Sequence, residues 1–180
     1  TNRGREDELR ELLHRRLLVL DGAMGTMLQA HDLTAADFGG PELEGCNENL
    51  VLTKPDIIRG VHEAYYAAGA DLVETNTFGA IRHVLSEYGL QEKAREINKK
   101  ACELARQAAD KHATKDRPRF VAGALGPGTK TISVTGGITY DEVVKNYAEA
   151  SQALLEGGVD LLLLETQQDT LNVKASLDGF

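Results

Sequence analysis

The sequence predicts an α/β fold built on a parallel β-sheet. Four short apolar runs, which we expect to form strands, alternate with longer segments whose apolar residues recur at helical spacing. Polar residues or glycines follow each run, which is the usual place for a ligand beside a parallel sheet. The predicted strands are Leu17–Leu20, Asp71–Glu74, Phe120–Leu125 and Val159–Leu164.

Two of these units share a sequence pattern. A Gly-x-Asp triplet precedes the strand and a Glu-Thr pair ends it, first between Gly69 and Thr75 and again between Gly158 and Thr166. The distance from Asp to Glu differs by two residues, which keeps the parity of side chains along a strand. The pattern indicates that the two segments are units of one architecture.

Composition excludes several classes of protein. The chain has 180 residues, of which 42% are apolar and 27% charged, so it can form one domain with a sizeable core. A formal net charge of -8 disfavours a nucleic-acid partner. No apolar run approaches the roughly 20 residues of a membrane span, and the charged segment Thr1–Arg16 has no apolar signal core. We therefore expect no membrane partner.

The two cysteines, Cys46 and Cys102, lie far apart and form no redox or metal-binding motif. Cys102 lies among good helix formers, where a buried and unreactive thiol is expected. This usage fits a reducing, cytoplasmic setting.

The chain is expected to divide into an N-terminal helical segment, residues 1–16, and a segment 17–180 that carries the strands. In the first, Arg5–Arg16 has leucines on one face. Residues 30–52 are a long connection, which is either a functional loop or a surface insertion.

Helix boundaries are predicted by capping residues. Thr53 is expected to cap a helix that ends at Gly69, and Thr139 with Glu142 forms a capping box for a helix that ends at Gly158. Other predicted helices are Ile81–Glu87, Gln91–Ala113 and Asp169–Leu177.

The segment after the first predicted strand has the character of a ligand site. Asp21 would lie at the carboxyl end of that strand, and Gly22 and Gly25 allow the backbone to approach a ligand closely. A short helix predicted from Thr26 would leave free N–H groups beside the carboxylate. This combination suits a zwitterion, with its ammonium on Asp21. The alternative is that Asp21 only caps the short helix.

A second carboxylate, Glu165, directly follows the fourth predicted strand. Because parallel strands end at one edge of a sheet, we expect Asp21 and Glu165 to face the same space. Buried carboxylates are costly unless they are paired, and a cationic ligand group between them would supply that pairing. The alternative is that Lys, Arg or backbone N–H groups satisfy each one separately.

Other motifs give weaker signals. The five histidines are scattered without ligand spacing, and only His31, near the first predicted strand-to-helix connection, is kept as a functional candidate. The stretch Gly123–Gly128 is rich in glycine but lacks the Lys-Ser/Thr of a phosphate loop. Its glycines are better explained by a close approach of the backbone to a ligand or to its neighbouring strand.

Four units cannot close a (β/α)₈ barrel, which needs about 250 residues with about 200 as the usual lower limit. An open doubly wound sheet fits the length, but the first turn lacks the G-x-G-x-x-G of a dinucleotide site. The residues alone do not decide whether the sheet belongs to a closed barrel or to an open doubly wound fold.

Four motifs together resemble the homocysteine-binding domain of the homocysteine S-methyltransferase family. They are Asp21–Thr26, Glu74–Phe78, Gly123–Pro127 and Leu164–Thr166, and two further stretches, Asn49–Asp56 and Asp169–Ala175, resemble its cobalamin-dependent members most. The resemblance implies a (β/α)₈ TIM barrel of which this chain carries the first four βα units.

The resemblance also implies a set of homocysteine-binding residues. Asp21 and Glu165 would hold the ammonium, and the backbone N–H groups of Gly22 and Ala23 would hold the carboxylate. Thr75 and Asn76 complete the predicted substrate-binding set, and no catalytic residue is predicted in this segment.

By the same resemblance, the parent protein is a methyltransferase that moves a methyl group from methylcobalamin to zinc-activated homocysteine. The family holds its zinc with three cysteines from the second half of the barrel. These cysteines would lie beyond Phe180, and neither Cys46 nor Cys102 matches them. We therefore expect this segment to bind neither zinc nor cobalamin alone and to be inactive by itself. Its expected partners are homocysteine, the remainder of the barrel, and folate- and cobalamin-binding modules.

Two alternatives remain at this stage. One is a homocysteine methyltransferase with another methyl donor, betaine or S-methylmethionine. The other is an inert half-barrel that needs a partner, since its apolar strands would otherwise be exposed at the sheet edges.

Overall fold

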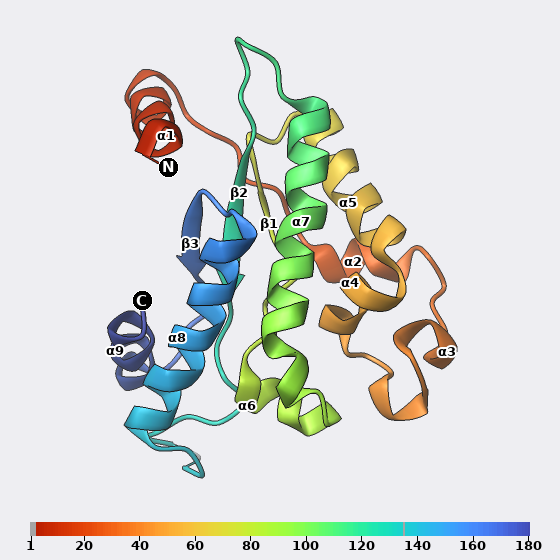
Figure 1. The fold of residues 1–180 in the computed structure, drawn as a ribbon, viewed down its shortest axis with the longest axis vertical. Helices are drawn as coiled ribbons and strands as arrows, with labels where there is room; N and C mark the ends of the chain where they lie inside the picture. Colours follow the sequence, from red (N-terminus) through yellow and green to blue (C-terminus); the bar gives the residue numbers. More distant parts are fainter. Residues whose placement is uncertain (1–2, 135) are drawn as a thin grey trace.

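The sheet has three parallel strands in a computed structural model that describes residues 3–134 and 136–180. The strands are β1 (Leu72–Glu74), β2 (Phe120–Leu125) and β3 (Leu161–Leu164). The central strand is β2: its Val121 pairs with Val73 of β1, and its Gly123 pairs with Leu162 of β3 (Figure 1). The prediction of an α/β fold on a parallel sheet is confirmed.

The prediction of a first strand at Leu17–Leu20 is wrong. Only Leu20 forms a bridge, to Leu72, although Val19 O also accepts hydrogen bonds from the N–H groups of Asp71 and Leu72. Leu17 is 91% exposed and Val19 is 56% exposed. The segment therefore runs beside β1 without a full ladder, because no described element covers its side chains. The described residues form three strands rather than the four that were predicted.

The helices alternate with the strands and pack along the sheet. The α-helices are α1 (Arg3–Arg15), α2 (Met24–Gln29), α3 (Ala35–Phe38), α4 (Leu50–Thr53), α5 (Pro55–Ala68), α6 (Arg82–Leu85), α7 (Ala94–His112), α8 (Tyr140–Gly157) and α9 (Thr170–Asp178). Short 3₁₀ turns lie at Pro41–Leu43, Asn47–Asn49, Ser86–Tyr88 and Gln91–Lys93. Helices α5, α7 and α8 run alongside the strands (Figure 1). Among the described residues, no helix combines the length and apolarity needed to cross a membrane.

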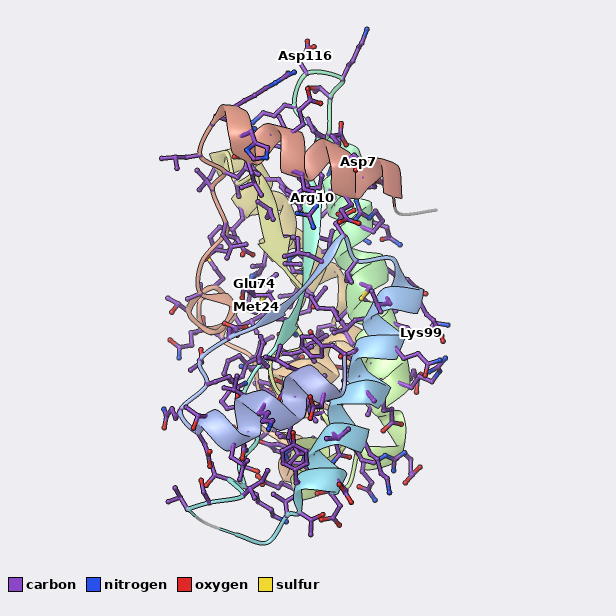
Figure 2. The ribbon with its side chains drawn as sticks, turned by 90° about the vertical axis from the view of Figure 1, so that its left-hand side faces the viewer. Asp7, Arg10, Met24, Glu74, Lys99 and Asp116 are labelled. Carbon is purple, nitrogen blue, oxygen red and sulfur yellow. The ribbon has the colours of Figure 1, made fainter. Side chains whose placement is uncertain are left out.

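Helix α1 stands apart from the other helices and lies across the end of the sheet where the strands begin (Figures 1 and 2). Its Arg5 forms an ion pair with Asp160 and donates to the carbonyl of Arg119. Residues 1 and 2 of the predicted N-terminal segment lie outside the described residues. The domain boundary after residue 16 stays a prediction.

Capping explains several helix boundaries. Thr139 and Glu142 form the predicted capping box of α8, and Gly69 and Gly158 end α5 and α8 in the left-handed conformation. The prediction that Thr53 caps α5 is wrong, because Thr53 ends the extra turn α4 and Lys54 precedes α5. Asp21 does not cap α2 either, since the N-cap residue of that helix is Ala23.

The long connection over residues 30–52 belongs to the core rather than to a surface insertion. Cys46, Leu50 and Val51 are completely buried in a cluster that also contains residues of α5 and α7. A second apolar cluster joins the sheet to α7 and α8 and includes the buried Cys102. The connection therefore provides a fixed wall beside the carboxyl ends of the strands.

The shared sequence pattern has a structural counterpart at the start of two strands. Asp71 and Asp160 precede β1 and β3, and the side chain of each is only 1% exposed. Asp71 accepts from the backbone N–H of Val19 at 3.0 Å, and Asp160 accepts from that of Val121 at 2.8 Å. Each aspartate thus joins its own strand segment to the preceding one, and arginines neutralise both.

Candidate functional site

A cavity of about 430 Å³ lies where the strands end. It is lined by Asp21, Gly22, Ala23, Met24, Gly25, Asn47, Glu48, Glu74, Thr75, Asn76, Phe78, Ala124 and Glu165. All six residues predicted to bind substrate are in this set. Figure 2 labels two of the lining residues, Glu74 and Met24, which lie close together near the middle of that view.

Three carboxylates enter the cavity from different segments. Asp21 follows the bridge residue Leu20, Glu74 is the last residue of β1, and Glu165 follows β3. The Asp21 carboxylate accepts from the backbone N–H of Glu74 at 3.1 and 3.2 Å. Within residues 3–134 and 136–180, no lysine, arginine or histidine forms an ion pair with any of the three. The cluster therefore has negative charge without a protein counter-charge.

This environment favours the protonated carboxyl groups. Burial, with a further contribution from Glu165, raises the pKa of Asp21 to about 7 despite the hydrogen bond from Glu74 N–H. Burial and the charges of Glu165 and Asp21 also raise the pKa of Glu74. Burial raises the pKa of Glu165 as well. A bound cation would reverse these shifts, because it would stabilise the ionised forms.

Hydrogen-bond donors lie beside the carboxylates. The backbone N–H groups of Gly22 and Ala23 have no acceptor among the described residues. The Tyr65 hydroxyl donates to Ala23 O at 3.1 Å and holds this turn in place. A Cβ at residue 22 would lie 3.3 Å from that hydroxyl, so glycine lets Tyr65 approach the turn. The turn can therefore present its N–H groups to an anionic group.

The side chains of Thr75 and Asn76 already have partners. Thr75 Oγ1 lies 2.6 Å from Thr77 Oγ1 and accepts from Ala124 N–H at 3.1 Å. Asn76 Nδ2 donates to Asn47 O at 2.8 Å, which attaches the β1 loop to the long connection. Both residues line the cavity, and these bonds fix the position of its wall.

The predicted substrate-binding set omits two acidic residues of the cavity, Glu74 and Glu48. Glu74 occupies the position in the first repeated unit that Glu165 occupies in the second, so the shared Glu-Thr pattern could have identified it. Glu48 lies in the long connection and accepts from Gly79 N–H at 2.8 Å, a contact that no local pattern indicates. His31, by contrast, is exposed and does not line the cavity.

The glycine-rich stretch after β2 lets two backbone segments approach each other. A Cβ at Gly126 would lie 2.6 Å from Phe78 O, and one at Gly128 would lie 2.2 Å from His83 Nε2. These two glycines do allow a close approach of the backbone, but the neighbour is the segment of residues 78–83, which belongs to no strand, rather than a strand.

Comparison with known proteins identifies the family. The family model described as homocysteine S-methyltransferase matches residues 18–180. This chain belongs to the homocysteine S-methyltransferase family. Over 174 residues it is 45% identical to the methionine synthases of Mycobacterium tuberculosis (strain ATCC 25618 / H37Rv) and Mycobacterium leprae (strain TN). The match covers 97% of this chain and 14% of each relative, so the chain spans about one seventh of their length.

Solved structures of the same family share the fold. The chain is similar to the homocysteine methyltransferase MmuM from Escherichia coli in its oxidized and metallated forms, with a TM-score of 0.79 and 28% identity to each. The alignment covers 95% of this chain and 60% and 61% of the two MmuM chains.

The described residues of this family member do not form a zinc site. Within them, no group of three histidine, cysteine, aspartate or glutamate side chains is arranged to hold a metal ion. Burial raises the pKa of the Cys46 thiol to about 11 and that of Cys102 to about 12, and the two belong to separate core clusters. Neither thiol is suited to ligate a metal as a thiolate.

Phe180 is the residue beyond which the resemblance places the three zinc cysteines. It follows α9, is 45% exposed and does not line the cavity. The residue therefore has no part in the candidate site. The position of the zinc cysteines beyond Phe180 stays a prediction about the parent protein.

Proposed function

We propose that this chain binds the amino-acid end of homocysteine in the cavity at the carboxyl ends of its strands. One observation carries the proposal. In this member of the homocysteine S-methyltransferase family, carboxylates without a counter-charge and backbone N–H groups without an acceptor among the described residues line the same cavity. An α-amino acid carries the two complementary charges one carbon apart, so it can satisfy both sets of groups at once.

Each predicted site residue has a role in this proposal. Asp21 and Glu165 bind the ammonium group, and the backbone N–H groups of Gly22 and Ala23 donate to the carboxylate. Thr75 and Asn76 contribute the wall beside the ligand, since their side-chain donors are already used. The chain thereby orients homocysteine and excludes water from its charged end.

The parent protein is proposed to be a methionine synthase, in which a methyl group passes from methylcobalamin to zinc-activated homocysteine and gives methionine. The 45% identity to mycobacterial methionine synthases supports this assignment. Zinc, when bound by cysteines elsewhere in the protein, would supply a homocysteine thiolate near neutral pH. The described residues contain no cluster arranged to hold a metal ion, and the part proposed for them is binding and orientation of homocysteine.

The proposed architecture is the first half of a (β/α)₈ barrel, preceded by a helical segment at residues 1–16. The similarity to about 60% of the MmuM chain supports it, as does the start of the family match at residue 18. The exposed Leu17 and Val19 would then be covered by the remainder of the barrel.

A second candidate is a homocysteine methyltransferase that uses another methyl donor, such as betaine or S-methylmethionine. It is favoured by the similarity to MmuM, which is described as a homocysteine methyltransferase. Product formation by the full-length protein with methylcobalamin, betaine or S-methylmethionine as the only donor distinguishes the candidates.

The substitution Asp21→Asn in the full-length protein tests the binding role. We expect its L-homocysteine Kd, measured by titration calorimetry, to rise by about ten- to a hundredfold, because a charged hydrogen bond contributes about 1.5–3 kcal/mol. Its zinc content, measured by atomic absorption, should not change.

The matched control for Asp21→Asn is Asp116→Asn, an exposed residue near the end of the molecule where the strands begin (Figure 2). Loss of zinc from Asp21→Asn, or an unchanged Kd, would show that the assigned role is wrong.

A further inference from the structure

We propose that Glu74 is a third ligand of the substrate ammonium, and that Glu74 and Glu165 share one proton that the ammonium displaces to solvent. This inference rests on the proposed homocysteine site and extends it to a residue that the resemblance did not include. It also makes amino-acid binding a proton-releasing event.

The position of Glu74 supports the role of ligand. Glu74 ends β1 while Glu165 follows β3, and the strand between them is β2. The residue of β2 that lines the cavity is Ala124, whose methyl group places no polar atom between the two glutamates. The backbone N–H of Glu74 also holds the Asp21 carboxylate, so one residue positions two of the three acids.

The charges around Glu74 leave no other means of neutralising it. The acidic groups facing the cavity are Asp21, Glu48, Glu74 and Glu165, and no basic side chain of the described residues lines it. The Tyr65 hydroxyl, from α5, donates to Ala23 O rather than to a carboxylate. Ionising every acid in a partly buried space without a cation is costly, so the ligand-free site retains a proton.

The retained proton belongs to the Glu74–Glu165 pair rather than to either residue alone. The two side chains line the same cavity from positions on either side of β2, and one shared proton turns the repulsion between two carboxylates into a hydrogen bond. Burial and the neighbouring carboxylates raise the pKa of Glu74, in accordance with this geometry. Glu48 is held separately by Gly79 N–H.

At the Glu74–Glu165 pair, binding exchanges one proton for one cation. The ammonium enters with its three N–H donors, and the shared carboxyl proton leaves to water. Asp21 loses its own proton to water in the pH range where it is protonated, and no other bond is made or broken. Three donors then face three carboxylates, Asp21, Glu74 and Glu165. An amino acid with an acylated nitrogen has no charge to exchange and leaves the proton in place, so the site selects a free amine.

Calorimetry of the full-length protein with L-homocysteine tests this exchange. Titration near pH 6 in two buffers of different ionisation enthalpy should show proton release, with close to one proton from the Glu74–Glu165 pair in addition to the proton of Asp21. The Kd should fall by at least about tenfold for each unit of rise in pH towards neutrality. Glu74→Gln should still bind, but it should release about one proton fewer than the wild type and show a flatter pH dependence.

The control variant is Glu103→Gln, an exposed residue of α7 paired with Lys100 at 3.1 Å, which should behave as the wild type. Glu74→Asp keeps the carboxyl group and should retain the proton release. N-acetylhomocysteine should not bind.

The outcomes separate this inference from the proposed function. If the wild type does not bind L-homocysteine, the proposed function fails. If the wild type binds without releasing a proton, or if Glu74→Gln releases as much as the wild type, the inference is overturned and the homocysteine site stands. If Glu74→Gln does not fold, the wild-type measurement near pH 6 decides: release of more than one proton supports the shared proton, because Asp21 supplies at most one, and release of one or fewer overturns it.

Discussion

Two kinds of acidic residue occupy opposite ends of the strands. At the start of the strands, the hydrogen bond from Arg16 lowers the pKa of Asp71 to about 2. Burial opposes ionisation of Asp160, but hydrogen bonds from Arg5 and Arg106 outweigh it and keep its pKa below the usual range. At the carboxyl end, Asp21 has no such partner and its pKa is raised. Arginines of the protein neutralise the first kind, whereas the second kind needs a bound cation for its neutralisation.

The raised pKa of Asp21 has a consequence for stability. A carboxyl group with a pKa of about 7 when folded and about 4 when unfolded stabilises the protein most below pH 4, and this contribution is lost as the pH rises through 7. Relative to the wild type, Asp21→Asn should gain about 1–2 kcal/mol in the free energy of unfolding between pH 4 and 7, a range discounted for partial exposure.

Urea unfolding of wild type and variant across this pH range measures the difference. The buried histidines His62 and His83, whose pKa values burial lowers to about 4, titrate in both proteins and cancel in the comparison. Asp116→Asn should show no pH-dependent difference. A constant difference for Asp21→Asn would contradict the raised pKa.

At the scale of elements, α8 is a helix whose first residue is fixed by a local capping box and which then packs against the sheet. Glu142 Oε2 accepts from the Thr139 N–H and hydroxyl, each at 2.8 Å, and Thr139 Oγ1 accepts from Glu142 N–H at 3.3 Å. The helix packs against α7, α9 and β2, so its first turn supports the loop that follows β2.

Thr139→Ala should lower the free energy of unfolding by about 1 kcal/mol, because it removes a side-chain cap and leaves a helix N–H unsatisfied. Thr53→Ala is the matched comparison, since Thr53 bonds to Asn49 O at 3.3 Å and does not cap α5. Its effect in the same urea measurement should be smaller. Equal losses for the two variants would mean that the capping box contributes nothing specific.

At the scale of the whole molecule, Asp160 joins segments that lie far apart in the sequence. It binds Arg5 of α1 and Arg106 of α7, and it accepts from Val121 of β2 at 2.8 Å. Arg5 also lies over the Phe120 ring, with 4.8 Å from its guanidinium carbon to the ring centroid. These contacts hold α1 across the start of the strands (Figure 2).

Asp160→Asn should cost about 2–3 kcal/mol of unfolding free energy, because both arginines lose their buried counter-charge while remaining partly open to solvent. Asp110→Asn, at an exposed partner of Arg106, should cost less than about 0.5 kcal/mol. Urea unfolding measures both. Protection of α1 amides from hydrogen exchange should fall only in Asp160→Asn, and unchanged protection would show that α1 is held by other contacts.

Much of the fold follows from local patterns. The predicted bounds of β2 and the capping box of α8 are those observed, because both depend on residues that are neighbours in the chain. The meeting of Asp21 and Glu165 in one cavity also agrees with expectation, since parallel strands end at one edge.

Other features depend on what packs against a segment. Leu17–Leu20 has the composition of a buried strand yet is largely exposed, whereas the weakly patterned long connection buries Cys46, Leu50 and Val51. The sequence by itself determined the strand-and-helix alternation and the acidic character of the carboxyl edge. Only the tertiary structure decided which acids meet without a cation, because burial and charge pairing are set by contacts between residues distant in the chain.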